Sequence, residues 1–175
     1  MSPMRILSSP SAATGTTTSP RTADGSPITS WHLFKITPAG VATDLKTLTP
    51  AIVGALALDA AGNLDGSDDN KIFQLTPSGT FRSLPVTIAN SGPLVTAADG
   101  NVYGASSNSG SAGKGSIFRL TTTGKVQTAV NFNGTSSGGT PCAGLISIPG
   151  GGYFGLTSAG GSADAGTLFK VTVTP

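Results

Sequence analysis

LVTAADGNVYGASSNSGSAGKGSIFRLTTTG (residues 94–124) contains two pairs of apolar runs, each pair joined by a Gly-bearing turn, around a Ser/Gly-rich segment. Asp-Gly between apolar runs is a strong short-range signal for a β-hairpin. We therefore expect strands at 94–98 and 102–106 with a turn between them. The second half of the stretch predicts a strand at 116–121, a turn that ends at Gly124, and a strand at 125–132.

The same pattern occurs four times along the chain. The first block, LVTAADGNVYG (94–104), aligns without gaps with LALDAAGNLDG (56–66) and LISIPGGGYFG (145–155), and more faintly with RILSSPSAATG (5–15). The second block recurs as LFKITPAG (33–40), IFQLTPSG (72–79), IFRLTTTG (117–124) and LFKVTVTP (168–175). Its phenylalanines, which are Phe34, Phe73, Phe118 and Phe169, lie 39, 45 and 51 residues apart. This varying period indicates whole modules joined by loops of unequal length.

Repeats of about 40–50 residues with four antiparallel strands are typical of β-propeller blades, which must stack to bury both faces. The third strand carries apolar side chains on both sides, with Phe118 and Leu120 on one face and Ile117 on the other. No segment shows helical periodicity over three turns. We predict an all-β fold, a β-propeller-like array of four antiparallel blades in one repeat domain (1–175). The blades are expected at about 4–48, 54–88, 92–133 and 143–175.

The last predicted blade lacks its fourth strand. Either the ring closes with three strands in that blade, or this is an incomplete propeller, and we favour the incomplete one because the first copy is degenerate. The end blades then expose apolar faces, so the array needs further blades or self-association.

Two copies carry a resemblance to a known family. The segments DGNVYGASS…GSIFRLTTTG and GGYFGLTSAGGSADAGTLFKVT resemble GloVer-type tandem repeats of bacterial choice-of-anchor surface proteins, and more distantly NHL-type propellers. The earlier copies depart from the pattern, with Thr14 and Asp65 at the position of Tyr103 and Phe154, and with Arg5 at the position of Leu94. The resemblance implies an extracellular or cell-surface, propeller-like protein without assigned catalytic residues.

The composition excludes several classes of function. Charged residues make up 10% of the chain and the net charge is +2, with basic residues scattered singly, which argues against a nucleic-acid binder. A single cysteine allows no internal disulfide. No apolar run approaches the roughly 20 residues of a membrane span. The segment MSPMRILSSPSAATG also lacks a signal-peptide apolar run, so either the protein is cytosolic or its export signal lies outside this stretch.

Loop lengths point to one rim of the array as the binding surface. The turns between first and second strands are constant, whereas the Gly-to-Phe distance between second and third strands is 19, 7, 14 and 14 residues in the four copies. Insertions on one face of a repeat protein often mark its binding face, although unconstrained drift gives the same pattern. The candidate ligand-binding residues on this rim are Arg21, Asp24, Asp68, Asp69, Asn108, Lys114, Asn133 and Asp164.

Other candidate sites carry weaker signals. The stretch NLDGSDDN (63–70) suggests calcium, but it lacks the acidic spacing and distal Glu of an EF-hand loop, so an acidic turn is favoured and no cofactor is expected. His32, the only histidine, is expected at a solvent-facing strand entry, and Cys142 is expected to be a small, partly buried residue.

Two functions remain from the sequence. The preferred one is a non-catalytic surface module that binds a protein or carbohydrate through Ser, Thr, Asn and Gly hydrogen bonds on the variable-loop rim. The alternative is a propeller enzyme of the lyase, lactonase or glycosidase kind, with a site assembled from carboxylates such as Asp59, Asp68 and Asp164.

Overall fold

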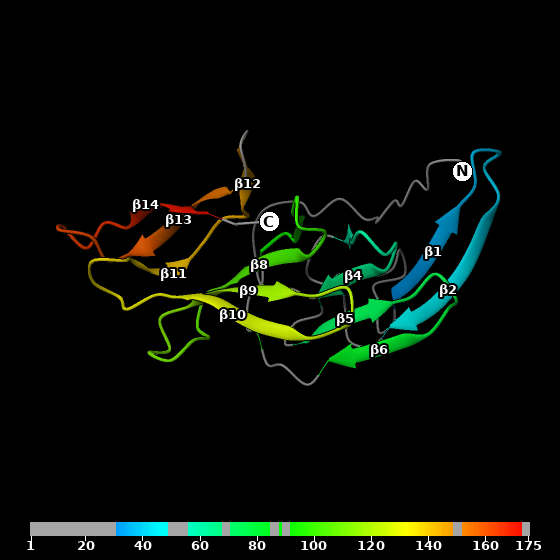
Figure 1. The fold of residues 1–175 in the computed structure, drawn as a ribbon, viewed down its shortest axis with the longest axis horizontal. Coiled ribbons are helices and arrows are strands. Elements are labelled where there is room, and N and C mark those ends of the chain that lie inside the picture. The colour runs from blue at the N-terminus through cyan, green and yellow to red at the C-terminus, as the bar shows by residue number, and fades with distance from the viewer. Residues whose placement is uncertain are drawn as a thin grey trace, which may run out of the picture. The chain divides into compact units, whose positions relative to one another are not determined.

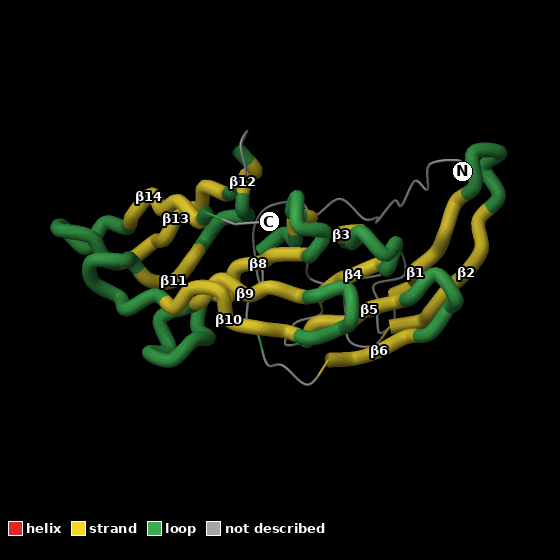
Figure 2. Tube along the Cα trace, viewed as in Figure 1, coloured by secondary structure: helices red, strands yellow, loops and turns green. Residues whose placement is uncertain are grey.

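All secondary structure in the described part of the chain is β-strand (Figure 2). The computed structural model describes residues 31–48, 56–67, 71–84, 88, 92–148 and 152–172. The chain divides into two compact units, Met1–Ile52 and Val53–Pro175, which are described separately below. The first block of the first copy (5–15) lies outside the described residues. None of the described segments is a helix with the length and hydropathy needed to cross a membrane.

The first unit contains an antiparallel hairpin of β1 (Trp31–Ile36) and β2 (Ala42–Leu48). These strands are the predicted third and fourth strands of the first copy. Their turn is closed by two backbone hydrogen bonds, from Thr37 N–H to the Val41 carbonyl at 3.0 Å and from Gly40 N–H to the Thr37 carbonyl at 2.9 Å. Gly40 has a φ of 81°, which glycine adopts readily.

The second unit contains two four-stranded antiparallel sheets whose strands neighbour each other in chain order (Figure 1). Sheets are numbered here by the copy that forms them. Sheet 2 consists of β3 (Ala57–Leu58), β4 (Leu64–Ser67), β5 (Ile72–Leu75) and β6 (Phe81–Leu84). Sheet 3 consists of β7 (Val95–Thr96), β8 (Val102–Ser106), β9 (Ser116–Leu120) and β10 (Val126–Asn131). Both sheets confirm the strand order predicted from the sequence.

Sheet 4 differs from the other two. It consists of β11 (Gly139–Pro141), β12 (Ile146–Ser147), β13 (Tyr153–Ala159) and β14 (Thr167–Val171). β13 is central, β14 lies on one side of it, and β11 and β12 pair with successive parts of its other side. The described residues end at 172, directly after β14.

The strand β11 lies between the ranges expected for the third blade (92–133) and the fourth blade (143–175), where no strand was predicted. Gly139 pairs with Ala159, and Pro141 pairs with Thr157. The chain reaches β13 through Gly138, which has a φ of 81° and where a Cβ would lie 2.4 Å from the Thr157 hydroxyl oxygen. Only glycine permits this approach. Because β11 has three residues and pairs with β13, which lies later in the chain, the sequence around 139–141 gives little indication of a strand.

A Gly–Phe pair is the common centre of the three copies in the second unit. In each copy a glycine of the second strand lies directly opposite the phenylalanine of the third strand. A Cβ added at these glycines would lie only 2.2–2.4 Å from the ring carbon Cζ, so the ring occupies the space above the glycine. The pairs are Gly66–Phe73, Gly104–Phe118 and Gly155–Phe169. In the first copy, Phe34 pairs with Asp44 beside a register shift.

The sheets of the second unit stack face to face. We call the face that carries the Gly–Phe pair the leading face, and the opposite face the trailing face. The trailing face of sheet 2 and the leading face of sheet 3 form one core cluster, which contains Ala57, Ile72, Leu84, Ile88, Leu94, Val102, Phe118 and Leu120. As predicted, Phe118 and Ile117 belong to opposite faces of sheet 3.

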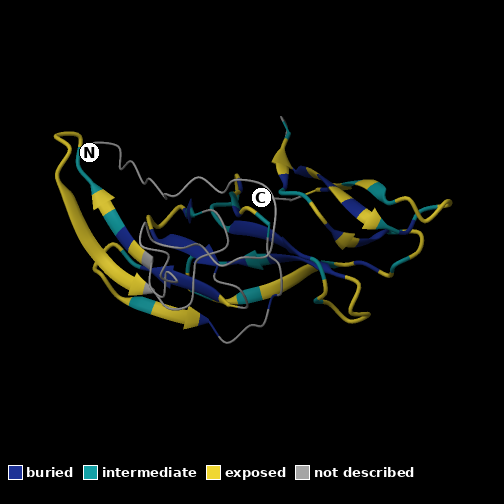
Figure 3. Cartoon of the chain, turned by 180° about the vertical axis from the view of Figure 1, so that it is seen from behind, coloured by how far each residue is buried: buried dark blue, intermediate teal, exposed yellow. Residues whose placement is uncertain are grey.

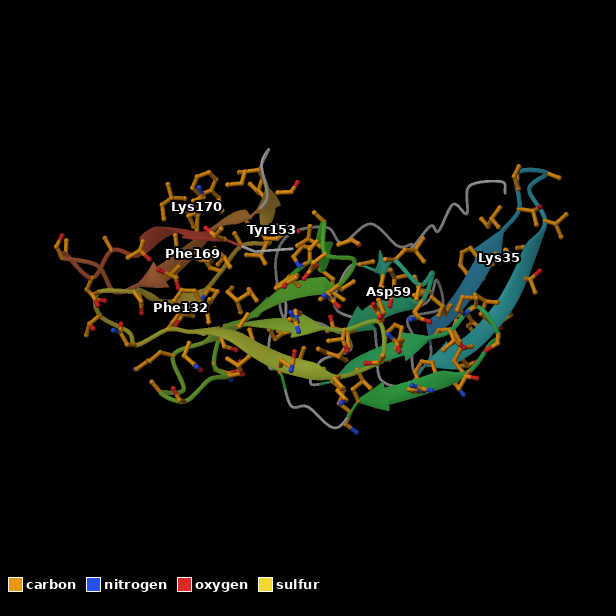
Figure 4. The ribbon with its side chains drawn as sticks, viewed as in Figure 1. Lys35, Asp59, Phe132, Tyr153, Phe169 and Lys170 are labelled. Carbon is orange, nitrogen blue, oxygen red and sulfur yellow. The ribbon has the colours of Figure 1, made fainter. Side chains whose placement is uncertain are left out.

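The second core cluster lies between the trailing face of sheet 3 and the leading face of sheet 4. The rings of Tyr103 and Tyr153 stack with their centroids 5.8 Å apart, and Phe132 contacts Phe169 edge to face at 5.0 Å (Figure 4). Sheet 3 is therefore covered on both sides. The three sheets of the second unit form an open, β-propeller-like array.

Candidate functional site

The loops of the second unit fall into two groups, as the alternating strand directions predict. On one side, turns of neighbouring sheets are joined by hydrogen bonds, from Ala60 N–H to the Gly100 carbonyl at 3.0 Å and from Asn63 Nδ2 to the Thr122 carbonyl at 3.0 Å. These turns have constant length in the sequence. They hold one sheet against the next and leave the variable connections to the other side.

The variable connections of sheets 3 and 4 come together as one structure. We call residues 107–115, 132–138 and 160–166 the loop cluster. The hydrogen bond from Thr140 N–H to the Lys114 carbonyl at 2.8 Å ties the first loop to β11, which follows the second. The second is tied to the third by the hydrogen bond from Gly161 N–H to the Thr135 carbonyl at 2.8 Å. The backbone therefore fixes the positions of all three loops.

Two loops of the cluster have the same backbone conformation. Gly115 N–H donates to the Ser109 carbonyl at 2.8 Å, and the equivalent Gly166 N–H donates to the Gly160 carbonyl at 2.9 Å. Two residues before these glycines, the equivalent residues Gly113 and Asp164 both have a positive φ, of 61° and 51°. The third copy and the fourth copy thus present matching loops with different side chains.

Four of the eight predicted site residues lie in the loop cluster: Asn108, Lys114, Asn133 and Asp164. Asn108 and Lys114 are exposed, and the Lys114 alkyl chain packs against Gly134, where a Cβ would lie 3.1 Å from the Lys114 Cγ. Lys114 is therefore anchored by its stem while its ammonium group remains available. The other four predicted residues (Arg21, Asp24, Asp68 and Asp69) lie outside the described residues.

The other two predicted residues in the loop cluster, Asn133 and Asp164, stabilise their own loops. Asn133 Oδ1 accepts hydrogen bonds from the backbone N–H groups of Thr135 at 2.9 Å and Ser137 at 3.2 Å. Asp164 Oδ1 accepts a hydrogen bond from Gly160 N–H at 2.7 Å. Both side chains are exposed, so they combine loop formation with a place on the surface.

The surface of the loop cluster is neutral and polar. Its exposed residues are small or hydroxylated, with one cation and one anion, and they include Asn108, Ser111, Lys114, Asn133, Thr135, Ser136, Ser162 and Asp164. Within the described residues, no group of three or more His, Cys, Asp or Glu side chains is placed to hold a metal ion. The arrangement offers hydrogen-bond donors and acceptors on a fixed backbone.

The two described carboxylates of the enzyme hypothesis both act in turns. Asp59 Oδ1 accepts hydrogen bonds from Ala61 N–H at 2.9 Å and Asn63 N–H at 2.8 Å, and its Oδ2 accepts one from Asn63 Nδ2 at 2.7 Å. Asp59 belongs to sheet 2 (Figure 4) and Asp164 to the loop that joins β13 and β14 in sheet 4. The structure does not bring these two side chains together at one site.

Asp65, in the stretch considered for calcium, is buried between strands. It is fully inaccessible, pairs with Gln74 across β4 and β5, and accepts a hydrogen bond from Gln74 Nε2 at 3.0 Å. Neither Asp65 Oδ2 nor the buried Ser67 Oγ has a hydrogen-bond partner among the described residues. Burial raises the pKa of Asp65 to about 7, against a smaller lowering by the Gln74 hydrogen bond.

A polar cluster between sheets 3 and 4 was missed by the sequence reasoning. Asp99 Oδ2 accepts hydrogen bonds from the Tyr103 hydroxyl at 2.9 Å and from Asn101 Nδ2 at 2.8 Å. Burial opposes the ionisation of Asp99, but these hydrogen bonds and the charge of Arg119 leave its pKa below the ordinary value. Burial and the hydrogen bond to Asp99 raise the pKa of Tyr103. The Asp-Gly-Asn-x-Tyr spacing is the signal that would have indicated the contact.

Two single residues of chemical interest are exposed. His32 Nδ1 lies 2.7 Å from Asp44 Oδ2, and the two side chains are 55% and 53% exposed, so the pair contributes little to stability. The exposure of His32 agrees with its expected solvent-facing position. Cys142 is exposed rather than partly buried, because it lies between β11 and β12 at the side of β13, with its N–H donating to the Leu156 carbonyl at 3.1 Å.

No protein-family model matches this sequence, and no curated protein sequence matches it. Among solved structures, the chain is similar to virginiamycin B lyase from Staphylococcus aureus, with 16% identity and a TM-score of 0.48 over 82% of this chain and 49% of that one. A catalytically inactive variant of that lyase with quinupristin gives the same identity and TM-score, and covers 50% of that chain.

A protein assigned as a gluconolactonase matches with 15% identity and a TM-score of 0.45, over 82% of this chain and 60% of that one. The chain therefore spans about half the length of the lyase structures it matches. What the described strands establish by themselves is the architecture: antiparallel sheets stacked like the blades of an open β-propeller.

Proposed function

We propose that this protein is a non-catalytic module that binds a polar protein or carbohydrate partner outside the cell through the loop cluster. The observation that carries the proposal is the backbone connection of three variable loops into one fixed, neutral surface. Surfaces of this kind recognise partners by hydrogen bonds from Ser, Thr and Asn side chains and from backbone groups. The resemblance of the last two copies to GloVer-type surface repeats supports the same location.

The hydrogen bonds that Asp59 and Asp164 accept in their own turns favour this function over the enzyme alternative. Asp59 and Asp164 already accept hydrogen bonds from backbone N–H groups of their own turns, so each carboxylate takes part in forming its turn. A general acid–base pair instead requires two groups that reach one reacting atom. Binding by the loop cluster requires no such pair.

The experiment is a binding assay of the full chain on a glycan array and on intact bacterial cells. The Lys114→Gln variant keeps the Cβ and Cγ carbons beside Gly134 but removes the positive charge from the loop cluster. We expect it to lower binding by about tenfold, the effect of one charged hydrogen bond. Lys125→Gln, which removes an exposed charge from the turn between β9 and β10, is the matched control and keeps full binding.

The two arms of the assay distinguish the partners. Binding to glycans indicates a carbohydrate, and binding to cells that protease treatment abolishes indicates a surface protein. Equal losses in Lys114→Gln and Lys125→Gln would contradict a role of the loop cluster, as would full binding by both variants.

A further inference from the structure

Sheet 2 buries two polar atoms that have no hydrogen-bond partner among the described residues, Asp65 Oδ2 and Ser67 Oγ. Both residues are fully inaccessible, and both belong to β4, which like β5 is buried along its whole length (Figure 3). They lie on either side of Gly66 in the strand, so the pleat places them next to each other on the trailing face. Because buried polar groups are nearly always paired, two unpaired atoms at neighbouring positions indicate a bound partner.

The described side chains around these two atoms do not supply that partner. Gln74, which lies opposite Asp65, donates from Nε2 to Asp65 Oδ1 at 3.0 Å and leaves Oδ2 unpaired. Ser67 lies opposite the buried Ile72, whose side chain has no polar atom. The residues of sheet 3 that pack against this face are all apolar, and they are Leu94, Val102, Phe118 and Leu120. No described neighbour therefore completes the hydrogen bonding of Asp65 and Ser67.

Smaller side chains fill this contact than the equivalent contact between sheets 3 and 4. There the rings of Tyr103 and Tyr153 stack, with their centroids 5.8 Å apart. The residues at these two positions between sheets 2 and 3 are Asp65 and Val102. A carboxyl group and an isopropyl group thus take the places of two aromatic rings. A contact with less side-chain volume and with unpaired polar atoms is the kind of place where an internal water molecule binds.

We propose that a single water molecule is bound between sheets 2 and 3, where it bridges Asp65 Oδ2 and Ser67 Oγ. A buried water molecule needs at least about two polar partners, and these atoms supply them. A calcium or magnesium ion would require about six oxygen ligands, and the facing side chains of sheet 3 carry none. The contact between sheets 2 and 3 is therefore hydrated, in contrast to the aromatic contact between sheets 3 and 4. This inference is independent of the loop cluster and of its partner.

The test counts the long-lived internal water molecules of the full chain by magnetic relaxation dispersion of the water oxygen, at about pH 5, where Asp65 is protonated. The double variant with Asp65→Leu and Ser67→Ala roughly keeps the side-chain volumes but removes both polar partners. We expect it to hold one water molecule fewer than the unaltered chain. Ser116→Ala is the matched control, because it removes a buried hydroxyl that is already paired with Ser109 Oγ at 2.6 Å, and it should keep the count. An unchanged count in the double variant, or the same loss in Ser116→Ala, would overturn the proposal.

Single substitutions test the same bridge through stability and change less of the core. At about pH 5 we expect Ser67→Ala to lower the folding equilibrium constant about tenfold, because the bridging water loses one of its two partners. In the Asp65→Leu background the same substitution should have almost no effect, since the bridge is already broken. Equal effects of Ser67→Ala in the two backgrounds would contradict the bridge. A stability at about pH 8 that depends on whether sodium, potassium or calcium is added at constant ionic strength would show a bound cation in place of the water and would also overturn the proposal.

Discussion

At the scale of the residue, Asp65 shows how one position changes its chemistry between copies. The equivalent residues are Tyr103 and Phe154, so a carboxyl group stands where later copies have an aromatic ring. The side chain points into the interface between sheets 2 and 3, with one hydrogen bond from Gln74 and one oxygen without a partner among the described residues. Such a group is costly to bury when it is charged.

This burial predicts that stability falls as the pH rises. In the unfolded chain the Asp65 carboxyl loses its proton near pH 3.8, whereas in the folded chain it keeps the proton to about pH 7. The folded state therefore binds more protons between these values, and the free energy of unfolding decreases across this window by up to about 4 kcal/mol. Urea unfolding of the unaltered chain should show a lower midpoint at pH 8 than at pH 5.

Asp65→Asn removes the ionisation and should leave similar midpoints at pH 5 and pH 8. Asp44→Asn, at an exposed position of β2, is the control and should retain the pH dependence of the unaltered chain. A midpoint that rises from pH 5 to pH 8 in the unaltered chain, or an unchanged fall in Asp65→Asn, would contradict this account.

Gly104 gives the second prediction at this scale. A Cβ at this position would lie 2.4 Å from Phe118 Cζ and 2.8 Å from a Leu94 methyl carbon, so Gly104→Ala must displace the core between sheets 2 and 3. We expect a loss of about 1–3 kcal/mol in the free energy of unfolding, as for other overpacked cores. Urea denaturation measures the loss.

Gly92→Ala is the matched control, because a Cβ there would make only ordinary contacts, the nearest at 3.6 Å. We expect a change below about 0.5 kcal/mol. Phe118→Leu should also cost less in the Gly104→Ala background than in the unaltered chain, since it returns space to the alanine. Equal effects of the two glycine substitutions would show that the ring is not held against Gly104.

At the scale of the element, the repeated turns are specified by local chemistry. The turn between third and fourth strands uses the same threonine in three copies, at positions 37, 76 and 121. In each turn the threonine hydroxyl accepts a hydrogen bond from the backbone N–H four residues later, at 3.0–3.2 Å. The glycine three residues after each threonine has a φ of 81–89°. These turns fix strand order without distant contacts.

Asn133 gives the prediction for this scale, because its side chain organises one loop of the cluster. Asn133→Ala removes the acceptor for the N–H groups of Thr135 and Ser137. We expect a loss of about 1–2 kcal/mol and faster amide exchange in 132–138. Hydrogen exchange measured by mass spectrometry resolves this segment.

Asn108→Ala serves as the comparison, since Asn108 lies in the neighbouring loop and its side chain has no hydrogen bond to another described residue. It should leave both stability and exchange unchanged. An Asn133→Ala variant with ordinary exchange in 132–138 would show that the backbone alone holds this loop.

At the scale of the whole molecule, burial is set by the position of a sheet in the stack. Ile117 and Leu168 occupy the same place in their copies, yet Ile117 is fully buried between sheets 3 and 4 and Leu168 is 69% exposed. The two residues therefore occupy equivalent positions in their strands, one on a face between two sheets and the other on the exposed face of sheet 4. Their sequence contexts, SIFRL and TLFKV, give no indication of this difference.

We expect Ile117→Ala to cost about 2–5 kcal/mol and Leu168→Ala less than about 0.5 kcal/mol, because only the first leaves a cavity. The measurement is urea unfolding of the two variants and of the unaltered chain. Similar losses in the two variants would mean that the faces of sheets 3 and 4 are equally covered in solution.

Much of the fold was predictable because it repeats local signals. Alternating apolar residues, Gly-bearing turns and the Gly–Phe spacing are each encoded within about ten residues, and the strands of sheets 2 and 3 formed where these signals predicted them. Strand direction likewise predicted that the variable loops of sheets 3 and 4 lie on one side, and the described loops of these sheets do so. Half of the predicted site residues lie in the loop cluster that results, and the other half lie outside the described residues.

What the sequence determined by itself is the antiparallel sheet of each copy, since turn chemistry and side-chain alternation act between near neighbours. The tertiary structure decided three features: the strand β11, the burial of Asp65, and the exposure of Phe154 and Leu168. Each depends on which surface lies against a residue, and surfaces are brought together by stacking between copies. The same apolar pattern therefore becomes a core in sheet 3 and an exposed patch in sheet 4.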